Sequence, residues 1–387
     1  MKITDYKITR YEFEMDRPIG DANGPYGNSH FNGAFLEIHT DEGITGLAPS
    51  ANDAVGTLFH LVEGEDPRGV IGLWKKMQDF VFKGGNEGAM KGAIGSIDIA
   101  LWDLKAKIAD EPLWQTLGAR EGRCKAYASG IDYCLSDEEI YKFYSRMADQ
   151  GVDAGKLKVG LDMDADLRRL GIMKEALQKA ARGRPQLCID SNEYWNPKQA
   201  IRYINRIEQD FDLTWAEEPA RRWDYDGLAK VSRNIKAAVA TGENINDISD
   251  FYPLISNEAV DVVEFGAGAT GITGAKQIGN LAFAYELPVA LMNCQANFMA
   301  HLGAAMPNHM MLEVVDPGRE KCMKWGHTIE DGFIQLSNKP GLGIEKDEEG
   351  LKKYGVTQYS KPSVPFPRRE GGGLHIVPPE PGEVPWK

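Results

Sequence analysis

The run Gly155-Lys156-Leu157-Lys158-Val159-Gly160 is the first of four short runs that decide the fold of this chain. Each run is apolar or β-prone, contains charged residues at its end, and precedes a segment with helical character. The acidic ends of the last three runs are 27 and 26 residues apart, about one strand, one helix and two loops. A β/α barrel brings such strand ends together at one rim. The other runs are Cys188-Ile189-Asp190-Ser191-Asn192, Trp215-Ala216-Glu217-Glu218-Pro219 and Thr241-Gly242-Glu243-Asn244.

The same alternation of strand and helix extends from about residue 124 to residue 314. Asn196 followed by Pro197 is a typical helix start, with an N-cap and a first-turn proline. The run Val260-Asp261-Val262-Val263 is β-branched with little alternation, as expected for a parallel strand covered by helices. We therefore predict barrel strands at 124–129, 155–159, 186–190, 213–217, 238–243, 260–265, 287–292 and 310–314. Helices are predicted at 138–150, 165–181, 197–210, 224–235, 248–257, 274–285 and 300–306.

The chain before the barrel is expected to contain strands and then helices. Residues 34–47 indicate a hairpin with its tip at Asp41-Glu42-Gly43, and residues 54–118 have helical character. In the helical segment 93–107, Asp98 and Asp103 are interpreted as structural acids. The Gly- and Pro-rich segment that begins at Pro18 is either a surface loop or a mobile lid over a pocket. From about residue 351 the chain is rich in proline, and we expect no core of its own there.

Composition excludes several classes of function. A formal net charge of -13 argues against a nucleic-acid partner or an anionic membrane. The five cysteines are scattered, which fits reduced thiols better than a disulfide framework or a zinc site. No apolar run is long enough for a secretion signal or a membrane span. We expect a cytoplasmic protein whose partner is a small molecule.

Asp190, Glu217 and Glu243 stand at matching positions of successive strand-helix units. Three oxygen ligands without His or Cys suit Mg²⁺ better than zinc or copper. Strand-end acids that cap the following helices are the alternative interpretation, but three acids in register favour the metal.

Lys156 and Lys158 alternate along one strand and therefore point to the same face. A solvated or salt-bridged pair is the alternative interpretation. Beside a divalent cation a lysine has its ammonium form disfavoured, so that it becomes usable as a general base. A carboxylate bound to Mg²⁺ has a more acidic α-C–H and a stabilised enediolate. These parts together predict abstraction of a proton α to a carboxylate.

At this point the sequence resembles the enolase superfamily, in its mandelate racemase/muconate lactonising subgroup. The resemblance spans nearly the whole chain and includes residues 93–107, the Lys-x-Lys pair, the three acidic motifs, Gly271-Ile272-Thr273-Gly274 and Glu313. It implies an α/β fold, a modified (β/α)7β TIM barrel with an α+β capping domain from the N-terminal region and the C-terminal tail. The implied domains are the cap at 1–122 with a substrate lid loop at 18–32, the barrel at 123–350, and a tail at 351–387 that packs on the cap.

The resemblance also implies the chemistry. One Mg²⁺ per subunit would be held by Asp190, Glu217 and Glu243, with Glu217 preferred to Glu218. Lys158 matches the base of the family, and Lys156 matches its helper near the substrate carboxylate. A homo-oligomer, a dimer or an octamer, is expected.

The sequence departs from the family pattern on the opposite face of the site. Many relatives carry an Asp on the sixth strand and a His on the seventh as a second base. Here Gly266 to Thr270 contains neither that Asp nor the alternative lysine, and Asn293 stands where the His is expected. His301 lies beyond, on the next helix, and is interpreted as structural. Racemisation needs groups on both faces, so a single lysine favours syn elimination.

We therefore predict a lyase, a sugar acid dehydratase, that acts on an aldonate or aldarate. A cycloisomerase that opens a lactone or anhydro ring, an epimerase or racemase, and a non-catalytic metal-binding relative are the alternatives. The stretch from Asp190 to Trp195 also resembles a motif of acid-sugar dehydratases, Asp-x-Asn-x-x-Trp. Candidate substrate contacts are Asn192, Trp195, Asn293, Glu313 and, on the lid, Tyr26 and His30.

Overall fold

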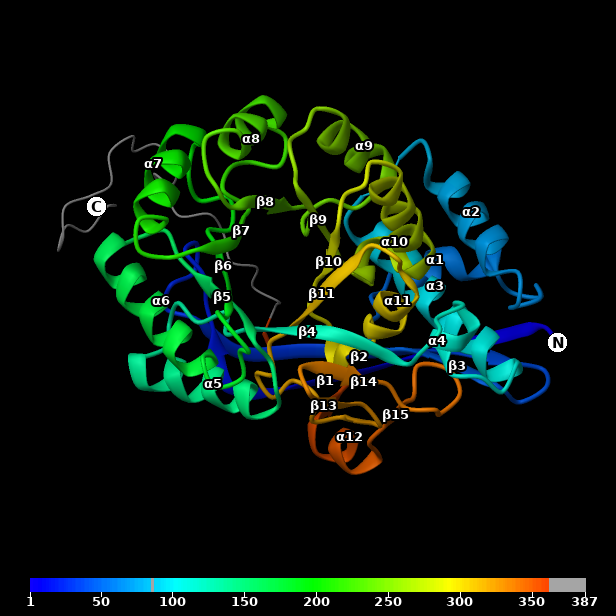
Figure 1. Cartoon of the computed structure of the whole chain (residues 1–387). Helices are drawn as coiled ribbons and strands as arrows, with labels where there is room; N and C mark the ends of the chain where they lie inside the picture. The colour runs from blue at the N-terminus through cyan, green and yellow to red at the C-terminus, as the bar shows by residue number, and fades with distance from the viewer. Residues whose placement is uncertain (85–86, 362–387) are drawn as a thin grey trace.

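The computed structural model describes residues 1–84 and 87–361. Its centre is a closed barrel of parallel strands, because β11 pairs with β4 as well as with β10 (Figure 1). All eight predicted barrel strands are present, with ends within two residues of the predicted ones, so the barrel prediction is confirmed. The strands are β4 (Arg123–Ser129), β5 (Ala154–Lys158), β6 (Gln186–Asp190), β7 (Leu213–Glu217), β8 (Ala238–Thr241), β9 (Val262–Phe265), β10 (Val289–Leu291) and β11 (His309–Val314).

Helices lie around the outside of the barrel and follow its strands in turn (Figure 1). Their starts follow from capping chemistry. The Asn196 side chain accepts a hydrogen bond from the Gln199 N–H at 2.9 Å just before Pro197, and Ser136 forms a capping box with Glu139. The helices are α5 (Asp137–Asp149), α6 (Met163–Leu177), α7 (Pro197–Ile207), α8 (Tyr225–Ser232), α9 (Ile248–Ser256), α10 (Ala267–Ala284), the 3₁₀ turn η2 (Gln295–Asn297) and α11 (Ala300–Ala305).

The inside of the barrel is apolar in one layer and charged in the next. Each of the eight strands contributes one residue to a buried apolar cluster, in which Tyr127 and Trp215 meet edge to face at 5.2 Å between ring centroids. Because side chains alternate along a strand, residues two positions further along face the same interior. On five strands these positions carry charge, at Lys156, Asp190, Glu217, Glu264 and Glu313. The apolar layer therefore forms the floor beneath a charged site at the carboxyl ends of the strands.

An antiparallel sheet and a set of helices form the cap. The sheet has the order β16-β1-β2-β3, and the turn between β2 and β3 contains the predicted tip at Asp41–Gly43. Regular pairing extends further than expected, so the irregular part of the lid covers residues 20–27 and not 18–32. The elements are β1 (Ile3–Ile19), β2 (Asn28–Thr40), β3 (Thr45–Ala48), β16 (Gly355–Val356), α1 (Val55–Leu58), η1 (Phe59–Leu61), α2 (Val70–Val81), α3 (Ala89–Ile108) and α4 (Leu113–Thr116).

Helix α3 joins the cap to the barrel through two buried acids. Asp98 accepts hydrogen bonds from the Thr273 N–H at 2.9 Å and the Thr273 hydroxyl at 2.5 Å, on barrel helix α10. Asp103 accepts bonds from the main-chain N–H groups of Leu47 and Leu342, both at 2.7 Å. Both acids satisfy buried donors of other elements. Their contacts fit the structural role expected from the sequence.

The C-terminal part of the chain holds more regular structure than predicted. Helix α12 (Glu348–Tyr354) crosses residue 351, where the sequence indicated a loss of pattern, and β16 follows it on the edge of the cap sheet. Residues 359–361 then hydrogen-bond to the cap, with the Tyr359 hydroxyl 2.9 Å from the Gly33 carbonyl oxygen. The remainder of the predicted tail lies outside the described residues. The other short strands are β12 (Met323–Trp325), β13 (Thr328–Glu330), β14 (Phe333–Gln335) and β15 (Ile344–Lys346).

None of the helices that the structure describes is long and apolar enough to span a membrane. All five cysteines are unpaired, as expected for reduced thiols.

Candidate active site

The two lysines of β5 lie among acids at the carboxyl ends of the strands. Lys156 is fully buried; its Nζ forms an ion pair with Glu217 and lies 3.0 Å from Glu313 Oε1 and 3.5 Å from Asp190 Oδ2. Lys158 is 4% exposed and forms an ion pair with Asp190. The predicted alternation is thus observed, with both ammonium groups inside the barrel. The two lysines are also salt-bridged, as the alternative interpretation expected.

The strand register explains why Asp190 and Glu217 meet the lysines. Lys158 is paired with Asp190 across β5 and β6, and Asp190 with Glu217 across β6 and β7, so the three side chains stand in a row. Glu217 Oε2 also accepts a hydrogen bond from the Trp215 indole N–H at 3.0 Å. Trp215 belongs to the apolar layer, so this layer holds the Glu217 carboxylate in place from below.

Asn192 joins the base to the remaining acids. Its backbone has a positive φ of 45°, a conformation that Asn adopts more readily than most residues. Its Oδ1 accepts a hydrogen bond from Lys158 Nζ at 2.9 Å, and its Nδ2 lies 3.3 Å from Glu243 Oε1 and 3.4 Å from Glu218 Oε2. Glu218 in turn accepts a bond from Asn244 at 2.8 Å. Asn192 therefore keeps Lys158, Glu218 and Glu243 within one cluster.

Asn293, just after β10, lies beside Glu313 of the adjacent strand β11. Glu313 Oε2 accepts hydrogen bonds from the Asn293 main-chain N–H at 3.1 Å and from its side-chain amide at 2.5 Å. Asn293 Oδ1 accepts a bond from Arg319 Nη1 at 2.7 Å. These partners fix the carboxamide orientation. A carboxamide held in this way is no substitute for a basic imidazole.

The other predicted substrate contacts are not placed beside the strand-end acids. Trp195 is 1% exposed and its indole N–H donates to the Gly160 carbonyl oxygen at 3.1 Å. Tyr26 is 96% exposed. His30 faces acids of the cap, with Nδ1 3.3 Å from Glu14 Oε1 and Nε2 3.7 Å from Glu12 Oε2. The structure therefore brings together the lysines and the acids, Asn192 and Asn293, but not Trp195, Tyr26 or His30.

Carboxylates outnumber ammonium groups in this cluster. Burial raises the pKa of Glu217 to about 8, against the attraction of Lys156. Burial also raises the pKa of Glu218, with Glu243 adding to the effect. For Asp190 burial acts in the same direction, but the Lys158 and Lys156 ammonium groups hold its pKa below the ordinary value. Burial would lower the pKa of Lys158, and the surrounding acids, led by Asp190, instead raise it. The site is thus short of positive charge.

The donor chemistry of the cluster fits a hard divalent cation. Its candidate ligands are carboxylates alone, which suit Mg²⁺. In the described part of the chain no group of three or more His, Cys, Asp or Glu side chains is arranged to hold a metal ion. We attribute this to the ammonium groups of Lys156 and Lys158, which contact Asp190 and Glu217 directly. The residues fit the ion by type and charge, and the two lysines lie between the carboxylates.

Two family profiles cover most of the chain. The profile described as mandelate racemase/muconate lactonizing enzyme, N-terminal domain, matches residues 7–118, and the profile described as enolase C-terminal domain-like matches residues 139–350. The chain belongs to the mandelate racemase/muconate lactonizing enzyme family of the enolase superfamily. The family and the fold predicted from the sequence are thereby confirmed.

Relatives in this family include both predicted types of enzyme. The chain is 30% identical to L-talarate/galactarate dehydratase of Salmonella typhimurium over 328 residues, covering 83% of this chain and 79% of that protein. It is 28% identical to 3,6-anhydro-alpha-L-galactonate cycloisomerase of Streptomyces coelicolor over 333 residues, covering 83% and 91%. The structure of the Salmonella dehydratase with Mg and L-lyxarohydroxamate matches with a TM-score of 0.82 at 27% identity, over 91% of this chain and 93% of that one. These relatives are a dehydratase and a cycloisomerase, which supports the prediction that this chain is an enzyme.

Three residues around the candidate active site were not predicted from the sequence. Glu264 is fully buried, and burial raises the pKa of its carboxyl group, with the neighbouring Glu217 adding to the effect; its inward direction follows from alternation with Val262. Asn23 of the lid donates to the Asn192 carbonyl oxygen at 3.0 Å. Arg319 bonds to Asn293 as described above. The contacts of Asn23 and Arg319 join segments far apart in sequence, so no local signal indicates them.

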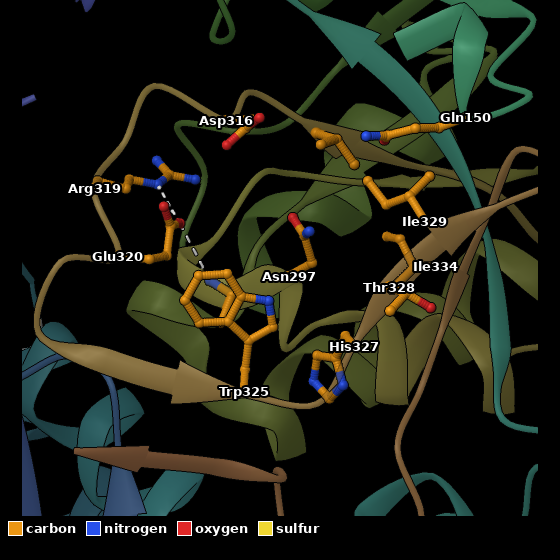
Figure 2. Close-up of a pocket in the computed structure, with 12 residues that line it drawn as sticks. Gln150, Asn297, Asp316, Arg319, Glu320, Trp325, His327, Thr328, Ile329 and Ile334 are labelled. Carbon is orange, nitrogen blue, oxygen red and sulfur yellow. Dashed lines mark hydrogen bonds and ion pairs between the residues drawn. The ribbon is translucent and has the colours of Figure 1, made fainter. Parts of the chain in front are cut away.

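A separate cavity of about 140 Å³ lies next to Arg319, between the loop after β10 and the C-terminal strands. Figure 2 shows Arg319 and Glu320 together at one side of it, with Trp325 next to Glu320 and with Ile329 and Ile334 on the opposite side. Neither lysine of the site and none of its strand-end acids lines this cavity. It is therefore distinct from the candidate active site.

Proposed function

We propose that this chain is a Mg²⁺-dependent lyase that removes the α-proton of a sugar acid and eliminates water. The observation that carries the proposal is the position of Lys158 Nζ, buried at the strand ends against Asp190 and 2.9 Å from Asn192 Oδ1. Relatives that are sugar acid dehydratases, such as the Salmonella protein, support it.

Lys158 is the general base of the proposed reaction. Burial would lower the pKa of Lys158, but the surrounding acids, led by Asp190, raise it and so favour the ammonium form. A divalent cation held by the Asp190 carboxylate would weaken its attraction for the ammonium group, and burial would then favour the neutral amine of Lys158. The Asn192 side-chain oxygen holds Nζ in place. A positioned amine at this point can accept a proton from a substrate carbon.

Mg²⁺ supplies positive charge that acidifies the α-C–H and stabilises the negative charge developing as the proton leaves. Asp190, Glu217 and Glu243 are the proposed ligands. Lys156 lies beneath them and adds an ammonium group on the side of Glu313. That charge favours binding of the substrate carboxylate to the cluster. Asn192, Asn293 and Glu313 are the proposed contacts for substrate hydroxyl and carboxylate groups.

The proposed elimination needs acid and base on only one face. Lys158 takes the proton from the α-carbon, the β C–O bond breaks, and the same lysine returns a proton to the departing hydroxide. The enol that remains tautomerises to a 2-keto-3-deoxy acid. Asn293 offers no second base, because its amide is committed to Glu313 and Arg319. His301 is buried in α11 and its ring nitrogens are bonded to Trp114 and Leu342.

Ring opening by the same lysine is the second candidate function. Similarity to 3,6-anhydro-alpha-L-galactonate cycloisomerase favours it. In that case the bond broken after proton abstraction joins the β-carbon to a ring oxygen, and no water leaves. Tyr26 and His30 remain candidate contacts only for a closed lid that differs from the arrangement observed, and Trp195 remains a candidate contact from the segment between β6 and α7.

A substrate screen separates the two functions. The protein would be incubated with Mg²⁺ and a panel of aldonic acids, aldaric acids, their lactones and anhydro sugar acids, and the products measured by mass spectrometry. Dehydration gives an α-keto acid lighter than the substrate by one water, whereas cycloisomerisation gives a product of unchanged mass. An epimer with solvent deuterium at the α-carbon would contradict both functions.

A homo-oligomer and a cytoplasmic location remain predictions. Light scattering on the purified chain measures the first, with a mass of two or eight chains expected.

A further inference from the structure

A buried polar cluster lies behind the Lys-x-Lys strand, outside the barrel wall. It joins the end of β4, the end of β5 and the helices α5 and α6, which are neighbours in Figure 1. Asp132 and Tyr144 are fully buried, and Arg169 is 5% exposed. No role in the proposed chemistry accounts for these residues, because their polar groups contact main-chain atoms and one another.

The main chain at Lys158 lacks a partner strand on one side. Strands β4 and β5 pair through Ser129 and Lys156, and the ladder ends there. Lys158 keeps its pairing with Asp190 on the β6 side only. Its N–H and C=O on the β4 side would be unsatisfied buried groups, which are costly to leave without partners.

Side chains take the place of the missing strand. Asp132 Oδ1 accepts a hydrogen bond from the Lys158 N–H at 3.1 Å, and Arg169 Nη1 donates to the Lys158 carbonyl oxygen at 2.8 Å. Asp132 and Arg169 are themselves paired, with Oδ1 and Nη2 2.9 Å apart. The Tyr144 hydroxyl lies 2.6 Å from Asp132 Oδ2 and 2.5 Å from the Lys156 carbonyl oxygen. Both lysines of the site are thus held through their main-chain atoms.

The segment that carries Asp132 is strained and also anchors the lid. Ile131 has a positive φ of 43°, a genuine outlier for a β-branched residue. Such a strained conformation is maintained only where contacts with the surrounding structure hold it in place. The Ile131 carbonyl oxygen accepts a bond from the Gly20 N–H at 2.8 Å, and the Tyr133 N–H donates to the Gly20 carbonyl oxygen at 3.0 Å. The start of the lid is therefore attached on either side of the residue that holds Lys158.

We propose that Asp132 and Arg169 are positioning residues that fix the main chain at Lys158 and thereby aim its amine at the substrate. The proposal rests on the proposed function, in which that amine takes the α-proton. Misplacement of a reacting group by about 1 Å can reduce a rate about 100-fold. Loss of this support should therefore affect proton abstraction more than binding of metal or substrate.

Three variants test the proposal in the full-length protein. Arg169→Met and Asp132→Ala remove the support, whereas Asp132→Asn keeps an oxygen that can accept the Lys158 N–H. Lys91→Met is the matched control, because Lys91 is 2% exposed and forms an ion pair with Asp247 at the contact between cap and barrel. The control breaks a buried ion pair without touching Lys158.

The first measurement is hydrogen exchange at the Lys158 amide, resolved by fragmentation mass spectrometry without substrate. We expect at least a 10-fold loss of protection in Arg169→Met and Asp132→Ala, and wild-type protection in Asp132→Asn and Lys91→Met. Unchanged protection in the first two would overturn the proposal. This result stands whether or not any sugar acid is turned over, so failure of the proposed function is recognised separately.

The second measurement is α-proton exchange with D2O at saturating substrate, together with KM and Mg²⁺ affinity. We expect a 10- to 100-fold loss of exchange in Arg169→Met and Asp132→Ala, with KM and Mg²⁺ affinity changed less than about threefold. Asp132→Asn should recover most of the exchange rate. Equal losses in these variants and in Lys91→Met would show a general effect on stability and would contradict a positioning role.

Discussion

Acid should destabilise this protein through His301, and the size of the effect follows from its environment. The ring is fully buried; its Nδ1 accepts a hydrogen bond from the Trp114 N–H at 3.0 Å, and its Nε2 lies 3.1 Å from the Leu342 carbonyl oxygen. This arrangement fits the neutral ring with its proton on Nε2. Burial lowers the pKa of His301 to about 3, from about 6.5 in the unfolded chain.

The unfolded chain therefore binds a proton in a pH range where the folded chain does not. Stability contributed by His301 is complete above pH of about 6.5 and falls as the pH drops towards 3. One pH unit corresponds to about 1.4 kcal/mol, and half of the unfolded rings are already protonated at pH 6.5, so the loss between pH 7 and pH 5 is about 2 kcal/mol. The assay is the free energy of unfolding in urea at pH 7, 6 and 5.

His301→Asn supplies the comparison, because its side-chain oxygen can still accept the Trp114 N–H and does not titrate. The variant should be less stable at pH 7 but lose about 2 kcal/mol less than the wild type between pH 7 and pH 5. Equal pH dependence in the two proteins would refute the reasoning. Loss of turnover in a fully folded variant would instead mean that His301 takes part in the chemistry.

Three further predictions concern the metal, a candidate contact and the cap. Mg²⁺ at 100 times its Kd should raise the free energy of unfolding by about 2.7 kcal/mol in the wild type, measured by thermal or urea unfolding, and much less in Glu243→Gln. Trp195→Phe should cost about 1 kcal/mol through the lost bond to Gly160 and leave KM unchanged; a large rise in KM would place Trp195 on the substrate. Asp98→Ala leaves the buried Thr273 N–H and hydroxyl without their acceptor, so urea unfolding should show a loss of at least about 2 kcal/mol, and Asp98→Asn a smaller one.

The barrel strands, and the charged residues at their ends that form the centre of the candidate site, could be predicted from the sequence alone for a physical reason. Strands such as Val262–Phe265 are covered by helices and appear as short apolar runs, and their ends must meet at one rim. Residues at those ends, such as Lys158 and Asp190, are therefore placed by topology. Helix α12 was not predicted, because it depends on a tertiary contact. The helix packs so closely on the chain at Lys321 that a Cβ at Gly350 would lie 2.2 Å from the Lys321 carbonyl oxygen.

Contacts made by loops could not be predicted in the same way. Tyr26 and His30 were chosen because they lie on the lid, but the lid residue that bonds to the site is Asn23. The same holds for Asp132 and Arg169, whose partners are main-chain atoms of another element and leave no pattern in the sequence.

The central claim is that Lys158 removes the α-proton. The most direct measurement is incorporation of solvent deuterium at the α-carbon of a bound sugar acid, comparing the wild type, Lys158→Ala and the exposed-lysine control Lys230→Ala, with Mg²⁺ binding followed by calorimetry. The account predicts that Lys158→Ala binds Mg²⁺ but incorporates no deuterium, while Lys230→Ala behaves as the wild type. Deuterium incorporation at the wild-type rate in Lys158→Ala would contradict it.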